Sequence, residues 1–135
     1  MPDLARIETV VFLQSVDLFS FCKAEEVLRI AAIAQEQRLP EGERVFREGD
    51  PSDVLYCVVQ GRVDLEAPDG SSWSAGPLAT FGVKEILSGR LRTETATTAA
   101  ETLVLAIEAE DFFDLLSHNI EIVRALFRQL LRQDD

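Results

Sequence analysis

Residues 54–70 read VLYCVVQGRVDLEAPDG and hold the pattern that decides the fold. The run VLYCVV at 54–59 is rich in β-branched and aromatic residues, as strands are. Residues 62–67 alternate polar and apolar side chains, which is typical of a strand with one solvent-facing side. The turn residues of Pro68-Asp69-Gly70-Ser71 follow, because proline fixes its own φ and glycine accepts positive φ. The stretch therefore predicts strands joined at a tight corner.

The glycines extend this pattern over the middle of the chain. All seven lie between residues 42 and 89. Turn residues at such regular intervals between short runs are typical of an all-β sandwich or barrel. Further strands are expected around VFRE at 45–48, at 93–99 and at 103–107.

Helical periodicity flanks this region on both sides. Apolar residues at helical spacing predict a helix over 4–19, and a second apolar face continues until Pro40 ends it soon after Leu39. After Ile107 a short helix is expected, then a break at His118-Asn119 and a final helix. The residues on these faces are Leu4, Ile7, Val10, Val11, Val27, Ile30, Ala31, Ala34, Phe112, Leu115 and Leu116. We expect one domain over 1–135, with N-terminal helices to about 36, strands over 37–107 and C-terminal helices over 108–135.

The final helix has two features with alternative interpretations. Its apolar stripe packs on the strands or forms a dimer seam. Its arginines, spaced by four, form a solvated face or dock an acidic partner. The stripe comprises Val123, Leu126, Phe127, Leu130 and Leu131, and the arginines are Arg124, Arg128 and Arg132.

Composition excludes several classes of function. With 135 residues, 13 basic and 24 acidic, the chain carries a formal charge of −11, which would repel a polyphosphate backbone. We therefore expect no nucleic-acid binding by this chain alone. The longest apolar run has six residues, so no transmembrane segment is expected. The N-terminus also lacks the apolar core of a secretory signal, which predicts a cytoplasmic location.

The sequence carries no common catalytic motif and no clustered metal ligands. His118 is the only histidine, and Cys22 and Cys57 are the only cysteines, expected to be reduced. We predict no catalytic residue, no metal site and no cofactor.

A local basic segment interrupts the acidic chain. Between Lys84 and Arg92 stand three basic residues and one acid. A helix turn after Gly82 would direct free backbone N–H groups outward, and an arginine adds a fork of donors suited to phosphate. We expect a small anionic ligand in this niche.

At this point the chain resembles the cyclic nucleotide-binding domains of the cyclic-AMP receptor protein, of cyclic nucleotide-dependent kinases and of gated channels. The resemblance rests on segments 15–19, 45–50, 55–63 and 81–93, which are similar to the family's helical start, first hairpin, central strand and phosphate-binding cassette. It implies a mainly β fold, an antiparallel β-roll or double-stranded jelly roll with N-terminal helices and a C-terminal helix. It also implies ligand contacts at Gly82, Val83, Arg92 and Thr93.

The sequence departs from the family pattern inside the cassette. Val83 stands where binding members carry a glutamate for the ribose 2′-hydroxyl, Glu85 replaces a small residue, and Leu91 replaces a proline. A hydrogen bond to a charged group contributes about 1.5 to 3 kcal/mol, so its loss should weaken cyclic nucleotide binding roughly ten- to a hundredfold.

We therefore expect a non-enzymatic regulatory or sensor domain with weak or lost cyclic nucleotide binding, and with another small anion as a candidate ligand. Two alternatives stay open. One is a cyclic AMP- or cyclic GMP-responsive domain of a longer transporter, helical-repeat or signalling protein. The other is a transcription regulator without its DNA-binding module. In each case the C-terminal helix would contact a second copy or an attached effector domain.

Overall fold

Eight strands and the helices that flank them fill residues 6–132, the part of the chain that the computed structural model describes. The helices are α1 (Arg6–Gln14), the 3-10 helix η1 (Asp17–Phe19), α2 (Ala24–Ala32), α3 (Val83–Ser88), α4 (Ala109–Ser117) and α5 (Ile120–Arg132). The strands are β1 (Ala34–Leu39), β2 (Arg44–Phe46), β3 (Val54–Gln60), β4 (Val63–Glu66), β5 (Ser72–Ala75), β6 (Thr80–Phe81), β7 (Thr95–Thr98) and β8 (Thr102–Glu108).

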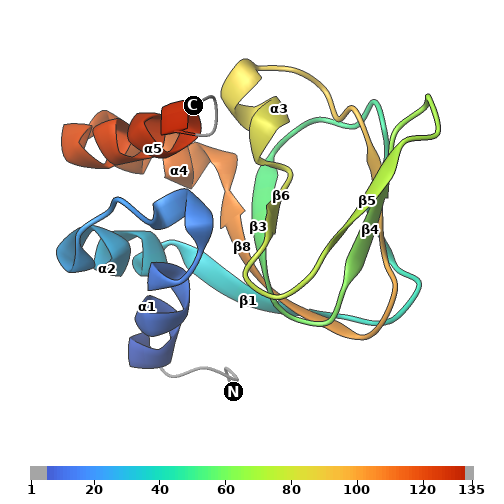
Figure 1. The fold of residues 1–135 in the computed structure, drawn as a ribbon, viewed down its shortest axis with the longest axis horizontal. Coiled ribbons are helices and arrows are strands. Elements are labelled where there is room, and N and C mark those ends of the chain that lie inside the picture. Colours follow the sequence, from blue (N-terminus) through green and yellow to red (C-terminus); the bar gives the residue numbers. More distant parts are fainter. Residues whose placement is uncertain (1–5, 133–135) are drawn as a thin grey trace.

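The strands form two antiparallel sheets that face each other as a β-roll. One sheet has the order β1-β8-β3-β6 and the other β2-β7-β4-β5. In Figure 1 the helices α1, α2, α4 and α5 gather on one side of the roll, and α3 lies above its upper end. The expected fold class, a β-roll between N-terminal and C-terminal helices, is confirmed.

The run at 54–59 is apolar on both sides because both faces of β3 are buried. Leu55 and Cys57 point toward the helices, whereas Tyr56 and Val58 point into the roll. Strand β8 divides its residues in the same way. By contrast, β4 buries Val63 and Leu65 and exposes Asp64 and Glu66, as the alternation predicted.

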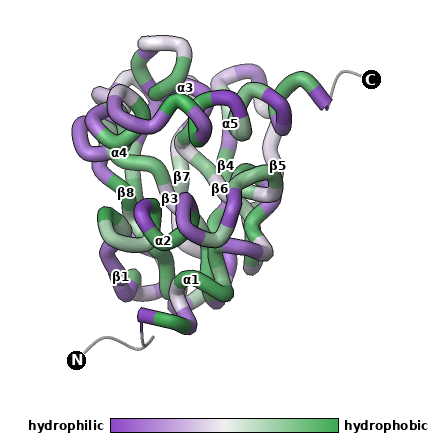
Figure 2. Tube along the Cα trace, turned by 90° about the vertical axis from the view of Figure 1, so that its left-hand side faces the viewer, coloured by the Kyte–Doolittle hydropathy of each residue, from purple (hydrophilic) through white to green (hydrophobic). Residues whose placement is uncertain are grey.

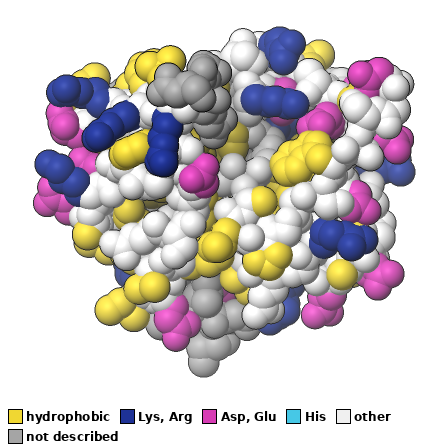
Figure 3. Space-filling model, in the orientation of Figure 1, with side chains coloured by type: hydrophobic (Ala, Val, Ile, Leu, Met, Phe, Trp, Pro, Cys, Tyr) yellow, Lys and Arg dark blue, Asp and Glu magenta, His cyan; other side chains and the backbone are white. Residues whose placement is uncertain are grey.

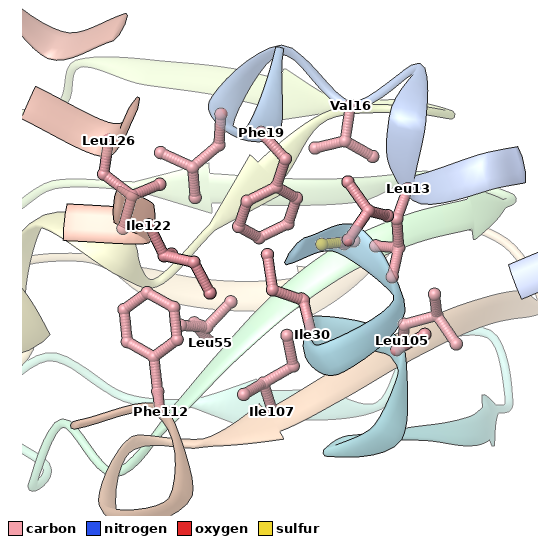
Figure 4. Packing of buried hydrophobic residues seen from close by; sticks show 14 of the residues in the cluster. Leu13, Val16, Phe19, Ile30, Leu55, Leu105, Ile107, Phe112, Ile122 and Leu126 are labelled. Atoms are coloured by element: carbon pink, nitrogen blue, oxygen red, sulfur yellow. The ribbon is translucent and has the colours of Figure 1, made fainter. Parts of the chain in front are cut away.

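The core between sheet and helices is built from large side chains of several elements. Figure 4 shows Phe19, Ile30, Leu55, Phe112 and Ile122 directed toward one another from η1, α2, β3, α4 and α5. Buried Gln129 of α5 accepts from Ser20 Oγ at 2.9 Å and donates to Asp17 Oδ2 at 2.7 Å. The C-terminal helix is thereby tied to the N-terminal segment.

The expected helices at the N-terminus need correction. The region 4–19 divides into α1 and η1, and Leu4 lies outside the described residues. The second helix ends at Ala32 instead of continuing toward Leu39, and the strands begin with β1 rather than at residue 37. Every residue of β1 has a partner on β8, so backbone pairing replaces the helix there. The break at His118-Asn119 between α4 and α5 is confirmed.

The final helix is amphipathic in an unusual way, because it has two apolar stripes. Ile122, Ala125 and Leu126 are buried in the domain's own core. A second stripe is exposed and contains Ile120, Phe127 and Leu131. Figure 2 shows hydrophobic and hydrophilic residues succeeding one another along α4 and α5, as expected for amphipathic helices. The stripe predicted from sequence therefore packs on the roll with one part and faces outward with another.

Candidate functional site

Arg92 is held at the top of the roll by its backbone. Its N–H donates to Asp50 O at 2.9 Å, and its carbonyl accepts from Gly49 N at 2.8 Å. The turn between β2 and β3 thus fixes the point from which the side chain starts. The side chain runs inward, is only 1% exposed, and places its guanidinium carbon 4.0 Å from the centroid of the Phe46 ring. This cation–π contact orients the guanidinium plane.

The Arg92 guanidinium already has acceptors within the protein. Nη1 donates to Gly82 O at 2.7 Å and approaches Glu85 Oε1 at 3.4 Å, while Nη2 donates to Val54 O. Its Nε is buried and has no hydrogen-bond acceptor among the described residues. Both terminal nitrogens are therefore engaged by acceptors of the protein, and Nε is the buried nitrogen of this guanidinium without a partner.

Glu85 is the negative partner of this arginine. Its side chain is buried to nearly the same extent, and its second oxygen accepts from Thr93 Oγ1 at 2.7 Å. Lys84 Nζ stands 4.0 Å from that oxygen. A carboxylate at this depth needs a counter-charge and hydrogen bonds, and Arg92 and Thr93 provide both.

Gly82 permits this arrangement for two reasons. Its φ of +79° begins α3 from the left-handed region, which side chains disfavour. A Cβ on Gly82 would also stand 2.9 Å from Arg92 Nη1. A larger residue would therefore force the arginine away from the Gly82 carbonyl.

The structure brings together three of the four residues predicted to contact ligand. Gly82 and Arg92 are hydrogen-bonded to each other, and Thr93 joins them through Glu85. Val83 is half-buried beside them and packs against the helix-side core. Two of the three basic residues of the segment face acids, because Arg92 contacts Glu85 and Lys84 pairs with Glu94 at 3.6 Å, whereas Arg90 is exposed.

An aromatic group lies beneath the guanidinium. Tyr56 stacks on Phe81 with ring centroids 4.9 Å apart, and Phe46 packs against both rings. Burial raises the pKa of the Tyr56 hydroxyl, and the positive charge of Arg92 partly opposes that shift. The phenol is therefore neutral near pH 7.

The sequence did not predict the polar contacts of Glu94 with Trp73 and Lys84, which lie beside the Arg92–Glu85 pair. Trp73 Nε1 of β5 donates to Glu94 Oε2 at 3.0 Å, and Lys84 contacts the other oxygen of Glu94. These residues line a cavity of about 220 Å³ whose other walls are Thr80, Phe81, Gly82 and Val83. The only signal available in the sequence was the acid directly after Arg92-Thr93.

A larger and more apolar groove separates α3 from α5. It has a volume of about 420 Å³, and Leu18, Leu87 and Leu130 line it together with Val83. Val83 thus borders both this groove and the smaller cavity. A shift of α3 would change the walls of both.

The arginines of α5 form a basic surface on the helix side. In Figure 3 dark blue side chains gather over α5 at the upper left. Arg128 and Arg132 place their guanidinium carbons 4.5 and 5.7 Å from the Phe21 ring centroid, and Arg124 pairs with Glu121. The Phe21 ring therefore compensates for the repulsion between neighbouring arginines.

Residues 6–132 contain neither a clustered set of metal ligands nor a helix that could span a membrane. No group of three or more His, Cys, Asp or Glu side chains in this part of the chain could hold a metal ion. Within the same residues, none of the helices has both the length and the apolar content to cross a membrane.

The chain is similar to known proteins of one family in both sequence and fold. Residues 36–119 match the family model described as "Cyclic nucleotide-binding domain". A "CRP-like cAMP-activated global transcriptional regulator" of Mycobacterium tuberculosis is 32% identical over 112 residues, which cover 77% of this chain and 50% of the relative. A "Cyclic nucleotide-gated potassium channel" of Mesorhizobium japonicum is 30% identical, covering 85% of this chain and 32% of the channel.

A solved structure matches over nearly the whole chain. The N-terminal domain of a transcriptional regulator from Streptomyces coelicolor superposes with a TM-score of 0.77 and 32% identity. The match covers 90% of this chain and 91% of that one. The curated relatives named above are longer, because this chain spans only half of the regulator and about a third of the channel.

Proposed function

The chain belongs to the cyclic nucleotide-binding domain family. We propose that it is a non-enzymatic regulatory domain in which the Glu85 carboxylate contacts Arg92, the residue that would otherwise bind a ligand's phosphate. The ligand contacts we assign are Gly82, Val83, Arg92 and Thr93. Cyclic nucleotide binding is weak or lost in the unmodified domain.

One observation carries this proposal: the buried contact of Arg92 with Glu85 and with the Gly82 carbonyl. A cyclic phosphate would have to displace the Glu85 carboxylate or approach it closely, and like charges in a poorly solvated site repel strongly. Val83 adds to the effect because it offers no acceptor to a ribose hydroxyl. The two departures from the family pattern, Val83 and Glu85, therefore both lower the affinity for a cyclic nucleotide.

Calorimetric titration with cyclic AMP and cyclic GMP tests the proposal. We expect weak or undetectable binding by the unmodified domain and at least tenfold tighter binding by Glu85→Ala, since Arg92 loses its internal anion. Val83→Glu combined with Glu85→Ala should tighten binding by a further order of magnitude, because it restores a carboxylate acceptor. Adding Arg92→Ala should abolish the gain.

A matched control removes a carboxylate elsewhere. Glu66→Ala changes the net charge equally, and Glu66 is an exposed residue of β4. It should leave cyclic nucleotide affinity unchanged. Tight binding of cyclic AMP by the unmodified domain, or no gain in Glu85→Ala, would contradict the proposal.

The unpartnered Nε of Arg92 favours a small anion as a second ligand class. Buried donors are almost always satisfied, so an oxygen ligand that reaches Nε would complete the site. Inorganic phosphate should bind Glu85→Ala more tightly than the unmodified domain. No binding of phosphate to either protein would exclude this second candidate.

The output of the domain is assigned to α5. Its exposed stripe of Ile120, Phe127 and Leu131 is available to a second copy or to an attached effector domain. The relatives named above include a regulator and a channel, both longer than this chain. We propose that the domain acts within a longer regulatory protein. That protein is a transcription regulator or, as the alternative, a channel or other signalling protein.

A further inference from the structure

The cavity beside Trp73 has the composition of a ligand site that does not use Arg92. Its walls combine an aromatic ring, a carboxylate, an ammonium group and apolar surface from Phe81 and Val83. Pockets that bind small molecules typically show this mixture of apolar lining and few polar groups. Its volume of about 220 Å³ is small, so it suits a small ligand or part of a larger one.

The charges around this cavity cancel. The Glu94 side chain is 12% exposed and faces Lys84 at 3.6 Å, so one negative charge meets one positive charge. The neighbouring pair of Glu85 and Arg92 is likewise balanced. An electroneutral cavity gives no net attraction to a phosphate ester, and it favours a neutral polar ligand.

Glu94 retains capacity to accept hydrogen bonds. An ionised carboxylate offers about four lone-pair sites. Trp73 Nε1 uses one of them and Lys84 lies near another. The remaining sites suit hydroxyl or amine donors, and two adjacent hydroxyls match the two oxygens of a carboxylate.

Trp73 provides a flat surface next to this acceptor. It lies on β5, the edge strand of its sheet, and remains 42% exposed although its indole N–H is fixed by Glu94. A fixed and exposed indole can stack on a heteroaromatic ring, a contact that contributes to binding of bases elsewhere. The ring and the acceptor border the same cavity.

We propose that this cavity binds a neutral ligand with a heteroaromatic ring and vicinal hydroxyls, namely a nucleoside, through stacking on Trp73 and hydroxyl donation to Glu94. The inference rests on the proposed function, because it takes the Arg92 subsite to be occupied by Glu85. It names a ligand class that needs no phosphate contact.

The test uses Trp73 as its reporter, because the chain has one tryptophan. Adenosine and guanosine are titrated into the unmodified domain, with fluorescence read at red-edge excitation and affinity checked by calorimetry. We expect saturable quenching by both nucleosides. Glu94→Gln keeps the side chain's size but removes its charge, and it should weaken adenosine at least tenfold. Glu66→Gln is the matched control and should bind like the unmodified domain.

A second ligand separates recognition by Glu94 from a general effect on the cavity. 2′,3′-Dideoxyadenosine lacks both hydroxyls, so it should bind about tenfold more weakly than adenosine to the unmodified domain. It should lose no further affinity in Glu94→Gln, because the two changes remove the same contact. Additive losses would overturn the assignment of the hydroxyls to Glu94.

The outcomes distinguish this inference from the proposed function. Absence of saturable nucleoside binding overturns the inference, whereas the proposed function still stands if Glu85→Ala gains cyclic AMP affinity. Nucleoside binding without any gain in Glu85→Ala overturns the proposed function and retains the Trp73 site. Binding that is unchanged in both Glu94→Gln and Trp73→Phe, measured by calorimetry, places the nucleoside elsewhere and overturns the inference.

Discussion

Replacing Arg92 with methionine should destabilise the fold far more than removing an ordinary surface arginine. The substitution leaves the Glu85 carboxylate almost fully buried, with Thr93 as its remaining hydrogen-bond donor and Lys84 4.0 Å away. The carbonyls of Gly82 and Val54 also lose their donor. Removing one partner of a buried ion pair costs about 3–5 kcal/mol, so we expect a loss of that size.

The converse substitution should cost less. In Glu85→Gln the arginine keeps two carbonyl acceptors and its contact with Phe46, so we expect a loss of about 1–3 kcal/mol. The double variant should lose less than the sum of the two single losses, because each removes the partner of the other. A coupling free energy of about 1–3 kcal/mol is expected from this cycle.

Urea unfolding monitored by Trp73 fluorescence measures these free energies. The matched control is Arg90→Met, because Arg90 is exposed and two positions away. It should change the free energy of unfolding by less than about 0.5 kcal/mol. If Arg92→Met does not fold, Arg92→Lys keeps the charge and should show an intermediate loss. An Arg92→Met variant as stable as the control would refute the internal ion pair.

Other predictions concern the fold, the assembly and the thiols. Gly61→Ala should lower the free energy of unfolding by more than about 3 kcal/mol, because its Cβ would lie 2.6 Å from the Glu101 carbonyl oxygen. The control Gly42→Ala meets no atom within 4 Å, so it should lose only about 1–2 kcal/mol, from its positive φ. Equal unfolding free energies of the two variants would contradict this prediction. If α5 forms a homodimer, Phe127→Glu should yield a folded monomer in sedimentation, and a monomeric unmodified domain would exclude the dimer. Burial raises the pKa of Cys22 to about 11 and of Cys57 to about 12, so the native thiolate fraction is very low, and iodoacetamide at pH 8 should label both thiols far faster after unfolding. Rapid native labelling would disprove it.

The central strands were predictable because their side chains record which faces are buried. The apolar run at 54–59 indicates two buried faces, and the alternation at 62–67 indicates one. Strand β1 was not predictable in this way. Its residues AQEQRL are mostly polar, and it forms because β8 offers a backbone edge to pair with. Strand β5, SWSA, was missed for the same reason, since only Ala75 is buried.

The candidate site was predictable in position but not in its internal contacts. The spacing of Gly82, Arg92 and Thr93 placed them together, and the structure does bring them together. The sequence could not show that Arg92 points inward onto Phe46, because that orientation depends on a ring from another sheet strand, β2. The same holds for Trp73 and Glu94, which are separated by 21 positions and meet because β5 and β7, the strand directly after Glu94, both pair with β4.

The contact of the Glu85 carboxylate with Arg92 changes how anion binding is linked to the free energy of unfolding. A ligand that binds only the native state stabilises it by an amount that rises with the logarithm of ligand concentration above Kd, so a fold whose site needs an external anion is more stable when that anion is bound. Glu85 supplies an anion that is always present, so the stabilisation becomes part of the fold. Added phosphate should then raise the unfolding free energy of Glu85→Ala more than that of the unmodified domain, because only the variant has an arginine without its anion. Glu85 therefore makes the stability of the fold independent of a charged ligand, and it weakens the response of the domain to such a ligand.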